Sequence, residues 1–158
     1  MDIHLQKAAS SGIILKAEFP GIADQDQMGS DLHASPLILV DESRIIQILL
    51  SLTSNALKFT SLGSVTITVS LEKEGGQEWL RVAVQDTGVG ISQQDIPKLF
   101  RLFGFLEESE QLNSNGIGLG LVISKQLVEQ FRGQIWCEST LDVGSTFTFT
   151  IKIEQEAL

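Results

Sequence analysis

Several short segments of the chain carry the alternating or β-branched apolar pattern of strands. Two of them, 64–71 and 78–86, are separated only by the stretch EKEGGQ, which predicts an antiparallel hairpin with a longer loop. The others are bounded by Gly, Pro, Asp or Ser residues, which favour turns. The predicted strands cover residues 11–18, 36–40, 64–71, 78–86, 134–140 and 145–153.

Three other segments carry helix signals. The apolar positions of 41–60 recur at helical spacing behind a capping residue, and 92–103 starts with a Ser cap and an early Pro. A glycine-rich stretch becomes a helix over 119–131. The residues expected to cap, start or end these helices are Asp41, Gly63, Ser92, Pro97, Arg132 and Gly133.

Strands follow strands along this chain, and helices come between the pairs. This order predicts an α/β (α+β) two-layer sandwich, with a mixed, largely antiparallel sheet covered on one face by about three helices. It is not the strict strand–helix alternation of a doubly wound fold. Residues 104–115 have no clear period and predict a loop.

A narrow polar stripe runs along the helix predicted at 41–60. Apolar residues cover most of the remaining circumference, which predicts a mostly buried helix. Periodicity alone favours a stripe that faces water. The alternative is a polar ligand, because an amide oxygen can ligate Mg²⁺ and a Lys one turn away can meet a phosphate. The stripe, with steps of three or four residues, consists of Arg44, Gln47, Ser51, Asn55 and Lys58.

Two glycine-rich stretches are candidates for ligand contact. In DTGVG, Asp86 is an acceptor at the end of a strand, and Gly88 and Gly90 allow a sharp turn or close approach to a flat ligand. Alone, this is a common turn pattern. GIGLGL at 116–121 precedes a helix, so that its N–H groups can bind an anion. A flexible hinge is the alternative, and the spacing fits neither a P-loop nor a dinucleotide fingerprint.

Composition limits the class of function. A length of 158 residues suits one domain. The net charge of −9 argues against binding to nucleic acid or to anionic lipid. There is no apolar run of about 18 residues and no signal-peptide pattern. The single Cys137 cannot form an internal disulfide, which favours a reduced, intracellular setting.

Taken together, these motifs resemble the catalytic, ATP-binding domain of sensor histidine kinases, in the superfamily shared with gyrase, Hsp90 and MutL. DESRIIQILLSLTSNALKFT resembles the N box, VQDTGVGIS the G1 box, IPKLFRLF the F box and GIGLGLVISKQLVEQFRG the G2 box. GSTFTFTI resembles the closing strand. The resemblance covers about residues 13–153 and implies a Bergerat-type fold in a single domain over 1–158. It implies that 104–118 is the ATP lid and 1–10 the remnant of a linker.

The resemblance also implies roles for individual residues. Asn55 would ligate Mg²⁺ and Lys58 would contact the phosphates, and these two are the expected catalytic residues. Asp86 would accept a hydrogen bond from the adenine amino group, and Thr146 would support that end through water. Core packing is the alternative for the two F-box aromatics. The expected ATP-binding residues are Asn55, Lys58, Phe59, Asp86, Gly88, Gly90, Ile91, Phe100, Phe103, Gly116, Ile117, Gly118, Leu119, Gly120, Leu121 and Thr146.

The chain departs from the family pattern in two places. Ser51 stands where the N box usually has an Asn, and its shorter hydroxyl would reach the ligand through a water. Residues 104–115 contain three Glu and no Lys or Arg. Arg101 is the nearest cation for the γ-phosphate, with a solvated helix position as the alternative. Ser51 and Arg101 are therefore candidate phosphate contacts.

The reaction implied by the resemblance is transfer of the γ-phosphoryl group of Mg–ATP to a histidine on a separate helical dimerisation domain, in two-component signal transduction. Neither His4 nor His33 has the acceptor context, so the isolated chain is not expected to phosphorylate itself. The first alternative is a nucleotide-binding regulatory module with little or no transfer activity. An ATPase clamp and a serine kinase for a sigma-factor antagonist are further relatives that the F box and the long G2 helix disfavour.

The same resemblance implies the partners. We expect the helical phosphoacceptor domain of the same protein and a downstream receiver domain, with no nucleic acid and no direct membrane contact. We expect the isolated domain to be monomeric and cytoplasmic, whether or not its parent protein is anchored in a membrane.

Overall fold

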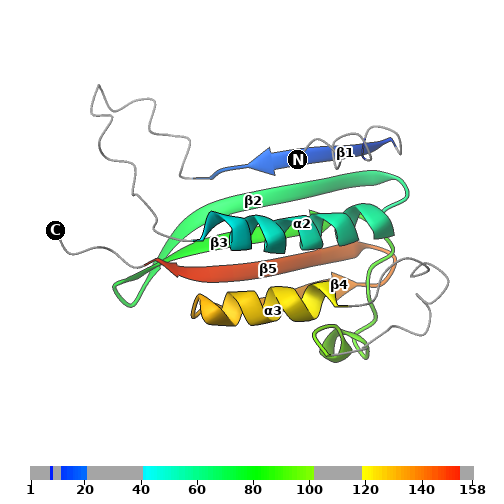
Figure 1. Ribbon diagram of the computed structural model, residues 1–158. Coiled ribbons are helices and arrows are strands. Elements are labelled where there is room, and N and C mark those ends of the chain that lie inside the picture. The colour runs from blue at the N-terminus through cyan, green and yellow to red at the C-terminus, as the bar shows by residue number, and fades with distance from the viewer. Residues whose placement is uncertain (1–7, 9–11, 21–40, 102–118, 154–158) are drawn as a thin grey trace, which may run out of the picture.

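The computed structural model describes residues 8, 12–20, 41–101 and 119–153. Its five-stranded sheet has the order β1-β2-β3-β5-β4, in which β1 is parallel to β2 and the other neighbours are antiparallel. Figure 1 shows both α-helices on one face of this sheet. The predicted two-layer sandwich is confirmed. The elements are β1 (Ile13–Glu18), α2 (Glu42–Phe59), β2 (Gly63–Glu74), β3 (Gln77–Asp86), the 3₁₀ helix η2 (Ile96–Lys98), α3 (Gly120–Gln130), β4 (Ile135–Thr140) and β5 (Gly144–Ile153).

Some predictions fall on residues that the structure does not describe. The strand at 36–40, the linker at 1–10 apart from residue 8, the lid at 104–118 and both histidines lie outside the described ranges. Among the helices that are described, none is long and apolar enough to cross a membrane.

The helix predicted over 92–103 is wrong in its described part. Only the 3₁₀ helix at Ile96–Lys98 forms there, with Pro97 in its first turn. Lys98 and Leu99 donate their backbone N–H groups to carbonyls three residues back, at 2.9 and 3.2 Å. Pro97 has no N–H to donate to a helical hydrogen bond. The Ser cap and the early Pro that predicted a regular helix therefore mark a short 3₁₀ turn.

The longer loop predicted between β2 and β3 is also wrong. The two strands pair as far as Glu74 and Gln77, which leaves only Gly75 and Gly76 to reverse the chain. Both glycines have positive φ, +57° and +81°. A two-residue turn of this kind matches the twist of the strands and requires φ above zero at both positions, which glycine adopts at no steric cost.

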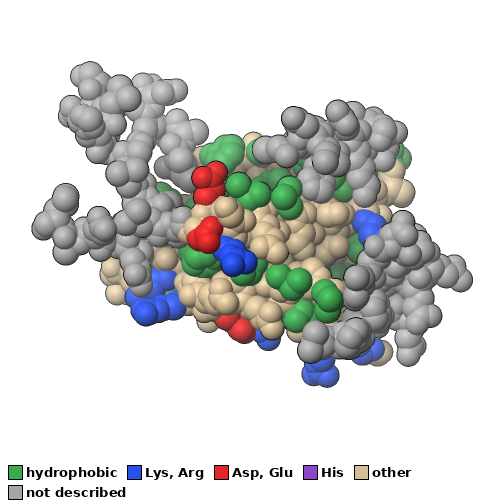
Figure 2. All heavy atoms as spheres, viewed as in Figure 1, with side chains coloured by type: hydrophobic (Ala, Val, Ile, Leu, Met, Phe, Trp, Pro, Cys, Tyr) green, Lys and Arg blue, Asp and Glu red, His purple; other side chains and the backbone are tan. Residues whose placement is uncertain are grey.

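Helix α2 begins as predicted but is less buried than expected. The Asp41 carboxylate accepts from the backbone N–H groups of Ser43 and Arg44, at 3.1 and 3.3 Å. Only one side of the helix packs on the sheet, so Ile46 and Leu50 remain 43% and 38% exposed. Hydrophobic side chains are visible across this helix-covered face of the molecule (Figure 2). The residues of α2 that are buried are Ile48, Leu52, Thr53, Ala56 and Leu57.

The N-cap supplies a first prediction. Asp41→Ala removes the side-chain acceptor of the Ser43 and Arg44 N–H groups, of which Arg44 keeps a bond to the Asp41 carbonyl at 3.1 Å. We expect it to lower the free energy of unfolding by about 1 kcal/mol. Asp41→Asn keeps an acceptor oxygen and is the matched control, with a smaller loss expected. Urea unfolding followed by circular dichroism measures both. Equal stabilities of wild type and Asp41→Ala would contradict the cap.

Helix α3 ends where the sequence predicts. Arg132 lies in the left-handed region, with φ of 55°, and donates its N–H to Glu129 at 3.0 Å. Gly133 donates to the Val128 carbonyl at 3.0 Å, which completes the Schellman pattern of bonds. A Cβ on Gly133 would lie 1.7 Å from the Thr150 carbonyl oxygen, so only glycine lets the chain pass this close to β5. The end of α3 is therefore fixed against the sheet.

Strand alternation decides which side chains meet the helices. On β3, Val82, Val84 and Asp86 are buried, and on β5 the buried face continues from Phe147 and Phe149 to Ser145. Because alternate residues of a strand share a face, the last polar residue of β3 lies on the same face as the core. The Asp86 carboxylate therefore lies next to the hydrophobic core, at the end of the sheet.

Candidate functional site

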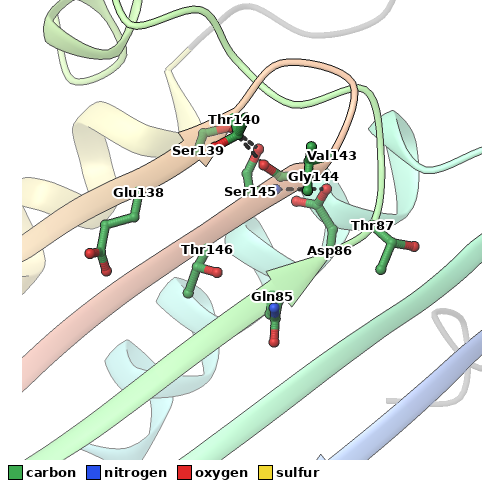
Figure 3. Close-up of a pocket in the computed structure, with 10 residues that line it drawn as sticks. All are labelled: Gln85, Asp86, Thr87, Glu138, Ser139, Thr140, Val143, Gly144, Ser145 and Thr146. Carbon is green, nitrogen blue, oxygen red and sulfur yellow. Dashed lines mark hydrogen bonds between the residues drawn. The ribbon is translucent and has the colours of Figure 1, made fainter.

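Asp86 is held at the end of β3 by its neighbours' backbone. Its side chain is only 5% exposed, and one carboxylate oxygen, Oδ1, accepts from the N–H groups of Gly88 at 2.9 Å and Ser145 at 3.3 Å. Figure 3 shows the bond to Ser145. The other oxygen, Oδ2, accepts no hydrogen bond from the residues that the structure describes. One face of the carboxylate is thus fixed, and the other can accept from a ligand.

The charge on Asp86 is costly where it lies. Burial raises the pKa of this carboxyl, against the opposing effect of the two backbone N–H groups, which lower the pKa. A buried carboxylate that lacks a full set of donors is stabilised by any ligand that brings one. An amino group is such a donor.

The glycine loop after Asp86 is wedged between two other segments. A Cβ on Gly88 would lie 2.3 Å from the Phe59 carbonyl oxygen, and Val89 donates its N–H to that same oxygen at 3.2 Å. Gly90, with φ of +68°, would place a Cβ 2.0 Å from the Thr140 carbonyl oxygen. The close approach that the structure shows is to the protein's own backbone, at the end of α2 and at the end of β4. Approach of these glycines to a flat ligand stays a prediction.

The polar stripe on α2 changes character along the helix. Arg44 and Gln47 are exposed, so the simpler interpretation of a stripe facing water holds there. Asn55, Lys58 and Phe59 are half-buried in the last turns, beside the glycine loop. The Lys58 ammonium lies 5.3 Å from the centre of the Phe59 ring. The C-terminal part of the stripe therefore lies beside the glycine loop.

The Ser51 side chain of α2 faces the start of α3. A Cβ on Gly120 would be 2.7 Å from the Ser51 hydroxyl oxygen, so the two helices approach closely at this point. Leu119 precedes α3 and makes no side-chain cap bond. The first N–H groups of α3 therefore have no side-chain acceptor from their own cap, and they start beside Ser51.

The F-box and lid predictions divide between described and undescribed residues. Phe100 packs its edge on Phe147, with ring centres 6.5 Å apart and planes at 72°, so the core-packing interpretation is confirmed. Ile91 and Leu121 also pack against the core, and Arg101 is exposed. The predicted site residues that lie outside the described ranges are Phe103, Gly116, Ile117 and Gly118.

Thr146 does not lie where we predicted. It pairs with Gln85, whereas Asp86 pairs with Ser145, so Thr146 is on the face of the sheet opposite to Asp86 (Figure 3). Ser145 is 6% exposed and supplies the N–H that Asp86 accepts. The alternation in STFTFTI already places Ser145 on the face of Phe147, and this signal could have found it.

A shallow pocket of about 320 Å³ lies at the same end of β3, β4 and β5 (Figure 3). Gln85, Glu138 and Thr146 line it, and their cross-strand pairing puts them on the face away from the helices. Asp86 borders this pocket, but its buried face points to α2 and not to Gln85. We therefore assign the candidate site to the helix side of Asp86. No group of three or more His, Cys, Asp or Glu that could hold a metal occurs among the described residues.

Comparison with known proteins places this geometry in a family. The family model of histidine kinase-, DNA gyrase B- and HSP90-like ATPases matches residues 40–155, and the chain belongs to this family. It is 45% identical over 121 residues to the sensor protein GacS of Pseudomonas syringae pv. syringae, covering 75% of this chain and 13% of GacS. It is 36% identical to the sensor histidine kinase WalK of Bacillus subtilis (strain 168), covering 74% of this chain and 19% of WalK.

Solved structures agree with the sequence relatives. Full-length ShkA in complex with AMPPNP matches with a TM-score of 0.75 and 30% identity, over 99% of this chain and 29% of ShkA. The nucleotide-free catalytic domain of the histidine kinase ThkA matches with a TM-score of 0.72 and 25% identity, over 96% of this chain and 86% of that domain. The fold is that of a histidine kinase catalytic domain, as predicted. This chain spans only a small part of GacS and WalK.

Proposed function

We propose that this domain binds Mg²⁺–ATP and transfers the γ-phosphoryl group to a histidine on a separate helical domain, in two-component signal transduction. The observation that carries the proposal is Asp86. It is a buried carboxylate with one oxygen fixed by two backbone N–H groups, and its other oxygen accepts no hydrogen bond from the residues that the structure describes. ShkA, a structural relative, was solved with the ATP analogue AMPPNP.

The adenine end follows from the donor that Asp86 lacks. The exocyclic amino group of adenine offers an N–H to the Oδ2 oxygen of Asp86. Guanine and the pyrimidines carry their hydrogen-bond donors and acceptors in other arrangements. Gly88 keeps the adjacent wall free of a side chain, because no Cβ fits there. A base that lacks this donor would leave the buried Asp86 carboxylate without its charge-assisted hydrogen bond, so such a base would bind more weakly.

The phosphate end lies at the last turns of α2 and the first turn of α3. Lys58 supplies a cation, and the start of α3, where Leu119 makes no side-chain cap bond, supplies N–H groups beside Ser51. The amide of Asn55 is half-buried and has no hydrogen-bond partner among the described residues, which fits one ligand position on Mg²⁺. Mg²⁺ binds proteins through few side chains together with substrate phosphates and water, and it would neutralise charge on the triphosphate.

The transfer itself needs little covalent chemistry from this domain. A neutral imidazole nitrogen of the acceptor attacks the γ-phosphorus, and the bond from that phosphorus to the β–γ bridging oxygen breaks. The leaving ADP keeps the electron pair. Asp86 and Lys58 hold the nucleotide at its two ends, so their contribution is positioning and charge neutralisation.

The acceptor and the later partners complete the proposal. We propose that the histidine belongs to a helical dimerisation domain of the same polypeptide, and that a receiver domain takes the phosphoryl group onwards. The matched parts of GacS and WalK are 13% and 19% of those proteins, which leaves room for such domains in the relatives. A nucleotide-binding module with little transfer is the second candidate, because Ser51 offers a hydroxyl where the family pattern has an amide.

Phosphoryl transfer to the helical domain tests the proposal and gives our second prediction. This domain is mixed with the histidine-bearing helical domain of its own polypeptide, Mg²⁺ and γ-labelled ATP, and acid-labile label on histidine is measured. We expect label with wild type and a loss of at least about 100-fold in rate with Asn55→Ala, because one metal ligand is removed.

Gln47→Ala is the matched control, since it removes an amide from the exposed part of the same stripe. It is expected to leave the rate unchanged. If the wild-type domain binds nucleotide but puts no label on the acceptor histidine, the regulatory module is favoured. Full activity of Asn55→Ala would contradict the assignment of Asn55 as a Mg²⁺ ligand.

A further inference from the structure

Ser139, the next-to-last residue of β4, is the centre of a hydrogen-bond network beside Asp86. Its hydroxyl oxygen accepts from the backbone N–H of Ile91 at 2.8 Å. The same oxygen lies 2.8 Å from the Gly144 carbonyl and 2.9 Å from the Ser145 hydroxyl (Figure 3). The Ser139 side chain therefore joins the start of β5 to Ile91, which lies 48 residues away in the sequence.

The chemistry of a hydroxyl fixes the direction of these bonds. A serine hydroxyl has one hydrogen to donate and two lone pairs that accept. The Gly144 carbonyl can only accept, so Ser139 donates its hydrogen there. Its two lone pairs then accept from the Ile91 N–H and from the Ser145 hydroxyl. Every bonding position of Ser139 is filled, and the side chain cannot rotate without breaking several bonds at once.

Further bonds tie the same segments together. The Gln93 amide nitrogen donates to the Ser139 carbonyl at 2.7 Å, and the Asp142 N–H donates to the Val89 carbonyl at 2.7 Å. The glycine loop and the β4–β5 turn are thus joined on both sides of Ser139. These two segments supply the two N–H groups, of Gly88 and Ser145, that hold Asp86.

We infer that Ser139 is a positioning residue for base recognition, which fixes the Asp86 carboxylate in the orientation that leaves Oδ2 for an amino group. The inference rests on the proposed function, because it assumes that Asp86 binds the adenine amino group. Ser139 does not touch the base. It acts through Ser145 on one side of the carboxylate and through the loop that carries Gly88 on the other.

A comparison of two nucleotides tests this inference and is our third prediction. Affinities are measured for ATP and for purine riboside triphosphate, which has hydrogen in place of the amino group. We expect wild type to prefer ATP by about 10- to 100-fold, the usual contribution of a hydrogen bond to a charged group. In Ser139→Ala we expect this preference to fall by about fivefold or more, mainly through weaker ATP binding.

The ratio of the two affinities separates positioning from stability, since both nucleotides meet the same folded protein. Ser70→Ala, which removes a half-buried serine on β2, is the matched control and should keep the wild-type ratio. If Ser139→Ala does not fold, Ser139→Cys keeps a similar volume with a weaker hydrogen-bonding group and should also lower the ratio.

The outcomes distinguish the two proposals. A wild type with no preference for ATP over the analogue would overturn the adenine site of the proposed function. A normal wild-type preference that Ser139→Ala retains would overturn only the role of Ser139. Equal losses for both nucleotides in Ser139→Ala would also overturn it, because they would show a general effect on the site.

Discussion

Asp86→Asn is expected to lower the affinity for ATP by at least about 100-fold while leaving the folded protein no less stable. The Asn side chain can keep its oxygen on the N–H groups of Gly88 and Ser145, since these donors hold one atom of the carboxylate. Its amino group then faces the ligand, so a donor meets the amino donor of adenine. Calorimetric titration with ATP and urea unfolding measure the two quantities.

The stability part of this prediction follows from the pKa. Burial raises the pKa of Asp86, so the folded state disfavours its ionised form. Wild type should therefore lose stability relative to Asp86→Asn as the pH rises from the ordinary aspartate pKa through the raised one, and stay level above it. At neutral pH the neutral amide avoids this penalty. A variant that loses binding without losing stability cannot be explained by unfolding.

Asp142→Asn is the matched control for charge. Asp142 is exposed in the neighbouring turn with φ of 61°, a conformation that Asn adopts readily. It removes the same negative charge at the same end of the sheet, and we expect unchanged ATP affinity. Normal binding by Asp86→Asn would show that the base is recognised elsewhere.

The sequence predicted the layers of the fold and the position of Asp86 at a strand end because local signals determined both. The alternating pattern predicted β2 and β3, and the N-cap at Asp41 predicted the start of α2. All three elements are present in the structure. Asp86 was found because DTGVG follows an alternating strand and therefore must lie at a strand end. The glycines were also found, although their closest neighbours proved to be the carbonyls of Phe59 and Thr140.

Other features depended on information that a motif does not carry. Thr146 was assigned from its place in GSTFTFTI, but the pairing of β3 with β5 puts Ser145 opposite Asp86. Ser139 gave no signal, since a serine in a strand is ordinary and its partners, Ile91 and Gly144, come from two other segments. Register and tertiary contact determine these positions, and neither follows from one local stretch.

The same closeness of backbone segments makes Gly88 sensitive to substitution. In Gly88→Ala the added Cβ would lie 2.3 Å from the Phe59 carbonyl oxygen and 2.9 Å from Oδ1 of Asp86. The loop must move away from α2, which breaks the bond from Val89 to Phe59 and displaces the N–H that holds Asp86. We expect a loss of about 1–3 kcal/mol in stability and at least about tenfold in ATP affinity.

Gly75→Ala separates these two effects. Gly75 has φ of +57° at the opposite end of the sheet, in the β2–β3 turn, and no atom lies within 4 Å of its Cβ position. Alanine there suffers only backbone strain, which costs about 1–2 kcal/mol. If Gly75→Ala loses a similar amount of stability and binds ATP normally, then the affinity lost in Gly88→Ala belongs to the site. Equal affinities in the two variants would mean that the wall beside Asp86 does not contact the base.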